Sequence, residues 1–268
     1  MAHPVVTEAE VVESAPAGAY RRLVLRAPEV ARRMSPGHFA TVGPGGERVL
    51  RRAFWLHRAD PAAGTVELVV AERGPGTREL VHSLVGERLS LIAPLGTPFP
   101  LPEGPVSALL VAEGHGSAAL FGLAEEIRRR GGQVGFILGA ASAAGLFGEA
   151  AARELTPDVL VVTADGSAGL AGTVTEVVAQ AVRAIDATVV YACGPAPVLA
   201  AVAATAVELA ARCWTAVEEP MACGTGICRG CVLPVAGADG VVREVRCCVE
   251  GPVFDGSRVR WAEPVVSV

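Results

Sequence analysis

The sequence predicts a three-part chain of the α/β plus β class. Residues 1–101 contain short β-rich runs separated by Gly and Pro turns, a pattern typical of a small antiparallel β-barrel. Residues 102–212 repeat an apolar strand, a Gly-rich turn and a helix, which predicts a doubly wound α/β domain. In residues 213–268 this periodicity stops and most of the cysteines gather, which predicts a small third domain.

Each strand of the predicted barrel is a short run rich in β-branched and apolar residues. The barrel ends at Pro102-Glu-Gly-Pro105, because two prolines around a glycine interrupt both strands and helices. The strands that we expect are Tyr20–Arg26, Arg48–His57, Thr65–Ala71 and Arg88–Ile92.

In the second unit, continuous apolar runs indicate parallel strands that are covered on both faces. The runs are Val106–Ala112, Gln133–Gly139, Val159–Ala164 and Thr188–Ala192. Between and after them, the helical periodicity predicts helices over Ser117–Arg130, Thr173–Ile185 and Pro197–Arg212.

The composition excludes some functions. Of the 268 residues, 51% are hydrophobic and 19% are charged, and the net charge of −5 gives no basic footprint for nucleic acid. The longest uncharged run, Ala187–Val207, contains Gly194, Pro195 and Pro197, which favour a strand, a turn and a helix over a membrane span. We therefore expect a cytoplasmic protein that binds neither nucleic acid nor membrane.

Four cysteines carry the strongest functional signal. Cys223, Cys228 and Cys231 have the four-then-two spacing of plant-type 2Fe–2S ligands, and a fourth candidate, Cys248, follows later. Glycines between the cysteines allow a tight loop that directs backbone N–H groups at the cluster. This pattern predicts one-electron transfer.

Two other uses of these cysteines are weaker. Zinc usually takes paired C-x2-C ligands and would use the adjacent Cys247 and Cys248 awkwardly. A disulfide framework is disfavoured by the odd cysteine count and by the lack of a secretory signal. The spacing alone does not choose between Cys247 and Cys248, because in extended backbone only one of two neighbours faces the iron. Cys213 is expected to be a small buried hydrophobe.

In the second unit, two turns lie where nucleotides bind open α/β sheets, beyond the carboxyl ends of strands. Gly114 and Gly116 follow the first strand, where a Gly-rich turn can bring a pyrophosphate onto a helix N-terminus. Cys193-Gly194-Pro195 ends a later strand. Each could also be an ordinary turn, with a buried thiol in the second case.

Two barrel segments suit a flavin nucleotide. Arg51-Arg52-Ala-Phe54-Trp55 combines cations for phosphate with aromatic rings for packing, although a solvated Arg pair beside a core Phe also fits. Gly74-Pro75-Gly76-Thr77 offers backbone N–H groups before a short helix.

Taken in order, these motifs resemble the ferredoxin-reductase superfamily over nearly the whole chain. The C-terminal segment is similar to the electron-transfer subunits of class 1B dihydroorotate dehydrogenases. The matching pieces there are Glu218-Glu219-Pro-Met221-Ala-Cys223-Gly-Thr-Gly-Ile-Cys228-Arg-Gly-Cys231-Val and Cys248-Val-Glu-Gly251-Pro252-Val253-Phe254. Further matches are Pro36-Gly37-His-Phe39, Pro94-Leu95-Gly96 and Asp165-Gly166-Ser167-Ala-Gly169.

The resemblance implies three redox groups and a partner. FAD would lie in the barrel and NAD at the α/β domain, and a 2Fe–2S cluster would exchange single electrons with an FMN-containing catalytic subunit in a hetero-oligomer. It implies Cys248 as the fourth ligand, and it requires no general acid or base in this chain. The residues carried over for FAD are Arg52, Phe54, Trp55, Gly74, Gly76 and Thr77, and those for NAD are Gly114, Gly116, Cys193, Gly194 and Pro195.

The chain departs from the family pattern at a few positions. Ala53 and Trp55 stand where relatives have Pro and Ser, so an indole replaces a small hydroxyl beside the flavin. Ala112, Glu113 and His115 alter the Gly-Gly-Gly-x-Gly turn, and we expect His115 to be a solvated turn residue. The departures leave two alternatives open: a reductase component that serves a different oxidoreductase, and a non-catalytic scaffold or redox sensor. Residues 140–145 contain no Arg to clamp a 2′-phosphate, which favours NADH over NADPH.

Overall fold

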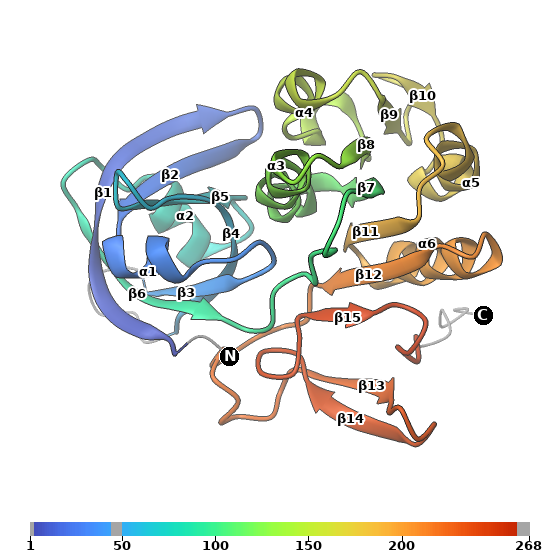
Figure 1. Ribbon diagram of the computed structural model, residues 1–268. Helices are drawn as coiled ribbons and strands as arrows, with labels where there is room; N and C mark the ends of the chain where they lie inside the picture. Colours follow the sequence, from blue (N-terminus) through green and yellow to red (C-terminus); the bar gives the residue numbers. More distant parts are fainter. Residues whose placement is uncertain (1–2, 44–49, 262–268) are drawn as a thin grey trace, which may run out of the picture.

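A computed structural model describes residues 3–43 and 50–261 of the chain. It has an antiparallel barrel, a mixed sheet flanked by helices, and a C-terminal segment with a two-stranded hairpin (Figure 1). The predicted fold class is confirmed. The first part of the predicted strand Arg48–His57, residues 48–49, lies outside the described residues.

Six strands close the barrel in the order β1-β2-β5-β4-β3-β6, and every pair is antiparallel. Alternation places one face of each strand inside, as in β5, where Val66, Leu68 and Val70 are fully buried. Two short helices, α1 (Pro28–Arg33) and α2 (Pro75–Val81), contribute Val30 and Leu80 to the barrel core. The strands are β1 (Val5–Ala17), β2 (Tyr20–Arg26), β3 (Phe39–Gly43), β4 (Arg52–Asp60), β5 (Thr65–Val70) and β6 (Arg88–Leu95).

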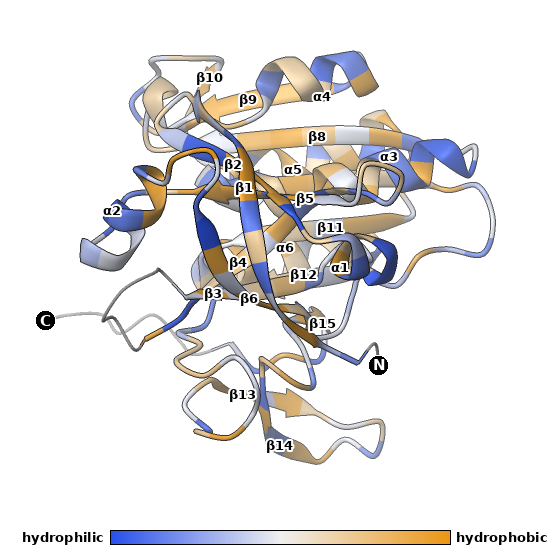
Figure 2. Cartoon of the chain, turned by 90° about the vertical axis from the view of Figure 1, so that its left-hand side faces the viewer, coloured by the Kyte–Doolittle hydropathy of each residue, from blue (hydrophilic) through white to orange (hydrophobic). Residues whose placement is uncertain are grey.

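The central sheet has the order β10-β9-β8-β7-β11-β12-β15. All its pairs are parallel except that of β12 with β15. The long strands are the most hydrophobic part of the molecule (Figure 2). The strands are β7 (Ser107–Glu113), β8 (Gln133–Ala140), β9 (Val159–Thr163), β10 (Leu170–Ala171), β11 (Val189–Gly194), β12 (Arg212–Val217) and β15 (Val253–Asp255).

Helices cover both faces of this sheet, as the doubly wound prediction requires. Neighbouring strand residues enter opposite cores: Leu109 packs with α5 and α6, whereas Leu110 packs with α3. A 3-10 helix, η1 (Gly114–Ala119), precedes α3, and η2 (Ala143–Gly145) precedes α4. The α-helices are α3 (Phe121–Arg129), α4 (Glu149–Leu155), α5 (Val174–Ala184) and α6 (Ala196–Glu208). No helix in the described ranges combines the length and apolar character needed to cross a bilayer.

The strand order reverses between β7 and β11, which are neighbours in the sheet although β8, β9 and β10 come between them in the chain. At such a switch point the turns after the two strands diverge and leave room for a ligand. Here those turns are η1 and Cys193-Gly194-Pro195. The tertiary structure therefore brings the two predicted nucleotide-binding turns together.

The end of the second unit differs from the prediction. The helix predicted over Pro197–Arg212 ends at Glu208, and after Ala210, at φ 55°, the chain enters β12. The predicted boundary after residue 212 falls within β12, because hydrogen bonds to β11 hold that strand in the central sheet. We propose three units with this boundary moved past Val217. The last unit contains the hairpin β13 (Val232–Ala236) and β14 (Val242–Arg246), and its residues 262–268 lie outside the described part.

Candidate functional site

A cavity of about 530 Å³ lies where the three parts meet. Phe54 and Trp55 of β4 form its barrel wall, and His115 of η1 forms part of the wall from the α/β unit. Met221 and Ala222, in the segment after β12, complete it. A largely apolar cavity of this size suits a planar cofactor ring.

The predicted phosphate-binding residues lie at one side of this cavity. Arg52 and Thr77 line it, and the Arg52 guanidinium covers the α-carbon of Gly76 so closely that a side chain there would collide with it. Thr77 Oγ1 accepts hydrogen bonds from the N–H groups of Arg73 (2.8 Å) and Gly74 (3.0 Å). These contacts fix the turn before α2 and place Gly76 beneath a cation.

The two adjacent arginines have different roles. Arg51 donates hydrogen bonds to Thr41 Oγ1 and O at 3.2 and 3.1 Å, and to Ser90 Oγ and O at 3.0 and 2.7 Å. It therefore joins β3 to β6, and its donors are used within the barrel. Both arginines line the cavity, and Arg52 is the one whose guanidinium lies over Gly76; its role in phosphate binding stays a prediction.

The residues predicted for NAD meet at the switch point. A Cβ on Gly116 would lie 3.0 Å from the carbonyl oxygen of Cys193, so a side chain there would force the two turns slightly apart. Gly114 (φ 60°) and Gly194 (φ 156°) both have backbone angles that favour glycine. Cys193 is 1% exposed, whereas Pro195 is exposed and is the N-cap residue of α6.

The expectation for His115 is wrong. Its ring lines the cavity, and Nδ1 lies 3.2 Å from NH2 of Arg73, while Nε2 lies 3.8 Å from Oε1 of Glu218. It also stacks on Tyr20, with ring centroids 6.2 Å apart. Burial lowers the pKa of His115, Glu218 opposes this shift, and Arg73 adds to it. Sequence reasoning missed this contact because its partners come from three distant segments.

Glu113, the other altered residue of this turn, packs beside Gly194, and burial raises the pKa of its carboxyl. A carboxyl that is more readily protonated repels a neighbouring phosphate less than an ordinary glutamate does. The pKa shift is therefore in the direction that would lessen repulsion of a phosphate at this position.

Backbone hydrogen bonds in the cysteine loop favour the thiolate form of Cys223, which is the form that ligates metal. The N–H groups of Thr225 and Cys228 donate hydrogen bonds to Cys223 Sγ at 3.4 and 3.5 Å. Burial alone would raise the pKa of Cys223, but these donors lower it to about 6. Gly224 and Gly226, with φ of 68° and 85°, allow the loop to turn back on this sulfur.

The predicted ligands lie in two pairs. Cys228 lies against Cys223, to whose sulfur its N–H donates at 3.5 Å, and Cys231 lies close enough to Cys248 to raise the pKa of that thiol. Within residues 3–43 and 50–261, no three Cys, His, Asp or Glu side chains converge on a single ion position. Structural zinc needs four ligands around one ion, whereas each iron of a 2Fe–2S cluster takes two protein ligands. The paired arrangement therefore fits the dinuclear cluster better.

The two candidates for the fourth ligand have different surroundings. Cys247 is fully buried in the apolar core, its N–H donates to Cys231 O at 2.7 Å, and burial raises the pKa of its thiol. Burial is the main cause that raises the pKa of Cys248 to about 12. The neighbouring Cys231 and the charge of Cys223 also raise this pKa. The arrangement favours Cys248, which remains a prediction. Cys213 is 4% exposed in the core, as expected.

The cluster loop packs directly on the barrel. A Cβ on Gly224 would collide with the Thr41 side chain of β3 and would lie 3.5 Å from Phe39. At the base of the loop, the Thr97 N–H donates to Gly251 O at 2.6 Å. The loop and the cavity wall are thus held against the same face of the barrel.

Comparison with known proteins identifies this arrangement. Residues 218–260 match the family model described as the iron-sulfur cluster binding domain of dihydroorotate dehydrogenase B, and the match begins directly after β12. The chain is 36% identical to the dihydroorotate dehydrogenase B (NAD(+)) electron transfer subunit of Shouchella clausii, covering 87% of this chain and 89% of the relative. It belongs to the family of these electron transfer subunits. The Geobacillus thermodenitrificans subunit is also 36% identical, covering 88% of this chain and 91% of that subunit.

Solved structures agree with this assignment. A chain of the NADH-dependent reduced ferredoxin-NADP oxidoreductase has a TM-score of 0.83 and 27% identity, covering 95% of this chain and 90% of that chain. A ferredoxin NADP+ reductase from Neisseria gonorrhoeae, solved with bound FAD and NADP, has a TM-score of 0.61 and 20% identity, covering 76% of this chain and 91% of that chain. The second likeness supports the fold alone. The family resemblance predicted from the sequence is confirmed.

The structure adds site residues to this family member that the motifs did not reveal. Arg73, Ala118 and Glu218 line the cavity. Of these, Glu218 was noted in the sequence only as part of the C-terminal family motif, without a role of its own. His57, two residues beyond Trp55, is 2% exposed and contacts η1. In the sequence, the only hint of this contact was a single histidine within an otherwise mostly apolar strand.

Proposed function

We propose that this chain moves electrons between NAD(H), FAD, a 2Fe–2S cluster and an FMN-containing catalytic subunit. It would be an oxidoreductase component that works in a hetero-oligomer with that subunit, of the dihydroorotate-oxidising kind. None of the seven cysteines, all in the described residues, forms a disulfide, which fits our further proposal of a cytoplasmic location.

One observation carries this proposal. The cavity wall that contains Met221 and Ala222 continues directly into Cys223. A ring packed on Phe54 and Trp55 would therefore lie beside the cluster loop. Bound there, FAD would supply the conversion between two-electron hydride chemistry with NADH and one-electron exchange with the cluster.

The residues of the chain would bind and orient the cofactors. Arg52 would neutralise FAD phosphate beside the turn that contains Gly74, Gly76 and Thr77, because its guanidinium already lies over that turn. The nicotinamide would approach the switch point at Gly114, Gly116 and Cys193-Gly194-Pro195, opposite the barrel wall. NADH would be preferred, because residues 140–145 supply no Arg for a 2′-phosphate.

The 2Fe–2S cluster would be held by Cys223 and Cys228 on one iron and by Cys231 and Cys248 on the other. Its exposed side would face the partner, because Cys228 is exposed and the neighbouring Ile227 is 85% exposed. An exposed apolar side chain at the tip of a redox loop suits the centre of a protein interface.

An anaerobic titration with NADH tests the internal path. The purified chain should contain FAD and two irons, and NADH should bleach the flavin and cluster absorbance together. Flavin that stays oxidised with excess NADH would favour the non-catalytic scaffold or redox sensor instead.

The partner is tested separately. Adding a catalytic dihydroorotate dehydrogenase subunit should yield a complex and raise NAD-dependent dihydroorotate turnover. A chain that NADH reduces, but that neither binds this subunit nor raises its turnover, would support the second candidate, a reductase component for a different oxidoreductase. Trp55, in the cavity wall, and Glu113, at the switch point, are the observations that favour this alternative.

A further inference from the structure

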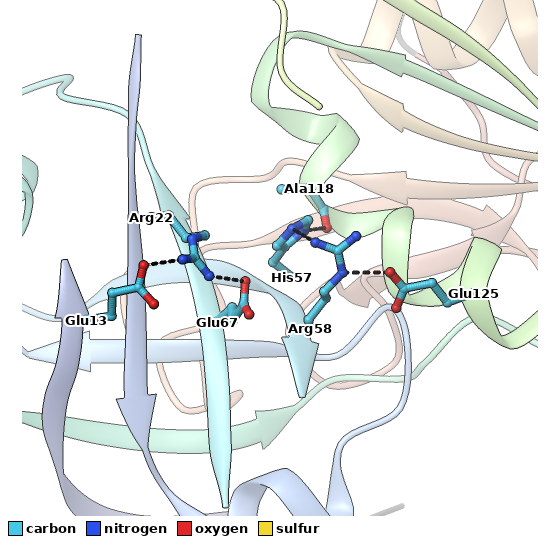
Figure 3. A network of polar contacts seen from close by, with 7 residues as sticks. All are labelled: Glu13, Arg22, His57, Arg58, Glu67, Ala118 and Glu125. Carbon is cyan, nitrogen blue, oxygen red and sulfur yellow. Dashed lines mark hydrogen bonds and ion pairs between the residues drawn. The ribbon is translucent and has the colours of Figure 1, made fainter. Parts of the chain in front are cut away.

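The barrel is fastened to the α/β unit at a buried histidine. Nδ1 of His57, on β4, lies 2.8 Å from the carbonyl oxygen of Ala118, on η1 (Figure 3). Nε2 of the same ring lies 3.2 Å from NH1 of Arg58, whose Nε donates to Glu125 Oε1 of α3 at 2.7 Å. Phe121 and Phe147 enclose the ring edge-on, each with its centroid 5.5 Å away.

These partners fix the protonation of His57. A carbonyl oxygen can only accept a hydrogen bond and a guanidinium can only donate one, so Nδ1 bears the proton and Nε2 is the acceptor. The neutral ring satisfies both partners, whereas a doubly protonated ring would face Arg58 with two opposed donors. Burial, the main cause, lowers the pKa of His57 to about 4, so this neutral form persists at neutral pH.

A second contact holds the other end of η1. His115 Nδ1 accepts from Arg73 NH2 at 3.2 Å, and its ring stacks on Tyr20; both partners belong to the barrel unit. The Tyr20 hydroxyl also donates to Gly145 O, beyond β8, at 2.7 Å. Because Arg73 is exposed, this contact is weaker than the buried one at His57.

The helix η1 is also fixed from within its own unit. Ser117 Oγ, which can donate one hydrogen bond, lies 3.1 Å from Gly114 O and 3.2 Å from Phe147 O, and Gly116 packs on Cys193. Any movement of η1 therefore moves the switch-point turns with it. His57 and His115 thus connect the cavity wall on β4 to the edge of the sheet where a nicotinamide would arrive.

We propose that His57 and His115 form a two-point clamp, the η1 clamp, that sets the spacing between a flavin on β4 and a nicotinamide at the sheet edge. The inference rests on the proposed function. In that function a bound NADH would pass a hydride to a bound flavin, leaving NAD+ and the reduced flavin. Hydride transfer needs reacting atoms about 3–3.5 Å apart, so a shift of about 1 Å slows it strongly. Both histidines act here as positioning residues.

The first measurement does not depend on redox activity. In FAD-loaded protein without NADH, His57→Leu should speed amide hydrogen exchange in residues 114–121 by about ten-fold, because the clamp no longer restrains η1. His57→Asn should restore most of the slow exchange, because its amide N–H can replace Nδ1 as the donor to Ala118 O. His82→Leu is the matched control: His82 is the exposed C-cap residue of α2, and its ring hydrogen-bonds within its own segment, to Arg78 O. If amide hydrogen exchange in residues 114–121 is equally fast in His57→Leu and His82→Leu, the proposed clamp is wrong.

The second measurement tests positioning. In rapid mixing with NADH, the rate of flavin reduction per bound FAD should fall about 10- to 100-fold in His57→Leu, with the Kd for NADH changed less than about three-fold. His115→Ala should show a smaller fall in the same direction, and it serves as the test if His57→Leu does not fold. Faster exchange with an unchanged reduction rate would reject the positioning role. Failure of NADH to reduce even the wild-type flavin would instead reject the proposed function, and the exchange result would still decide the clamp.

Discussion

The guanidinium group of Arg52 lies directly over the α-carbon of Gly76. The two residues come from β4 and from the start of α2, and together they form the side of the cavity where we place FAD phosphate. This contact explains why residue 76 is a glycine. Its φ alone would allow any residue, because Gly76 is not in the left-handed region.

Gly76→Ala should therefore weaken FAD binding without unfolding the chain. The new methyl group would displace the flexible end of Arg52 and so remove a cation from the phosphate. We expect the Kd for FAD to rise at least about ten-fold, equivalent to about 1.4 kcal/mol. Fluorescence titration of the FAD-depleted protein measures this. Gly104→Ala is the control, because a Cβ at Gly104 meets nothing within 4 Å, and equal Kd values in the two variants would contradict the role of Arg52.

Cys248→Ser should remove the 2Fe–2S cluster. A serine hydroxyl is a poor replacement for a thiolate on iron, and Cys231 would lose the sulfur paired with it. We expect iron content and cluster absorbance to fall by more than about half, with FAD retained. Full cluster absorbance in this variant would show that Cys248 is not the fourth ligand.

Cys247→Ser should keep the cluster and lower stability. Cys247 is fully buried among apolar side chains, where a hydroxyl without a partner costs about 1–3 kcal/mol. Thermal unfolding should therefore occur at a lower temperature, while the iron content stays that of the wild type. If Cys247→Ser loses its iron and Cys248→Ser does not, Cys247 is the fourth ligand instead of Cys248.

Gly224→Ala should separate the cluster loop from the barrel. The added methyl group would collide with Thr41, so the loop must move away from β3 and slow electron transfer from flavin to cluster. Gly240→Ala carries similar backbone strain, since φ is 76° there and 68° at Gly224, but a Cβ at Gly240 meets nothing within 4 Å. In stopped-flow reduction by NADH, only Gly224→Ala should show delayed bleaching of the cluster. Equal delays in both variants would mean that strain, not packing, controls this step.

The chain should lose stability as the pH falls from 6.5 towards 4. The unfolded chain protonates His57 near its usual pKa of 6.5, whereas the folded chain does so only near 4, so acid favours unfolding. The stabilisation present above pH 6.5 should fall by about 2 kcal/mol at pH 5. Comparing thermal unfolding at pH 7 and pH 5 should reveal a smaller loss in His57→Asn than in the wild type. Equal losses would show that this histidine is not held neutral in the folded chain.

The sequence by itself predicted the fold class and the cysteine loop. Strand runs and the spacing of Cys223, Cys228 and Cys231 are local patterns, and a few consecutive residues determine them. It missed β12 because one short strand directly after a helix has no pattern of its own: its place is set by hydrogen bonds to β11.

Which of the individually weak motifs meet is determined by packing between the barrel, the sheet and the C-terminal segment. Arg51 and Arg52 are adjacent in the sequence and both line the cavity, yet Arg51 joins two barrel strands whereas Arg52 lies over Gly76. His115 looked like a solvated turn residue and lies instead between Arg73 and Glu218. The physical reason is that a side chain's role depends on neighbours distant in the sequence, and these become neighbours only when the barrel, the sheet and the cluster loop pack around one cavity.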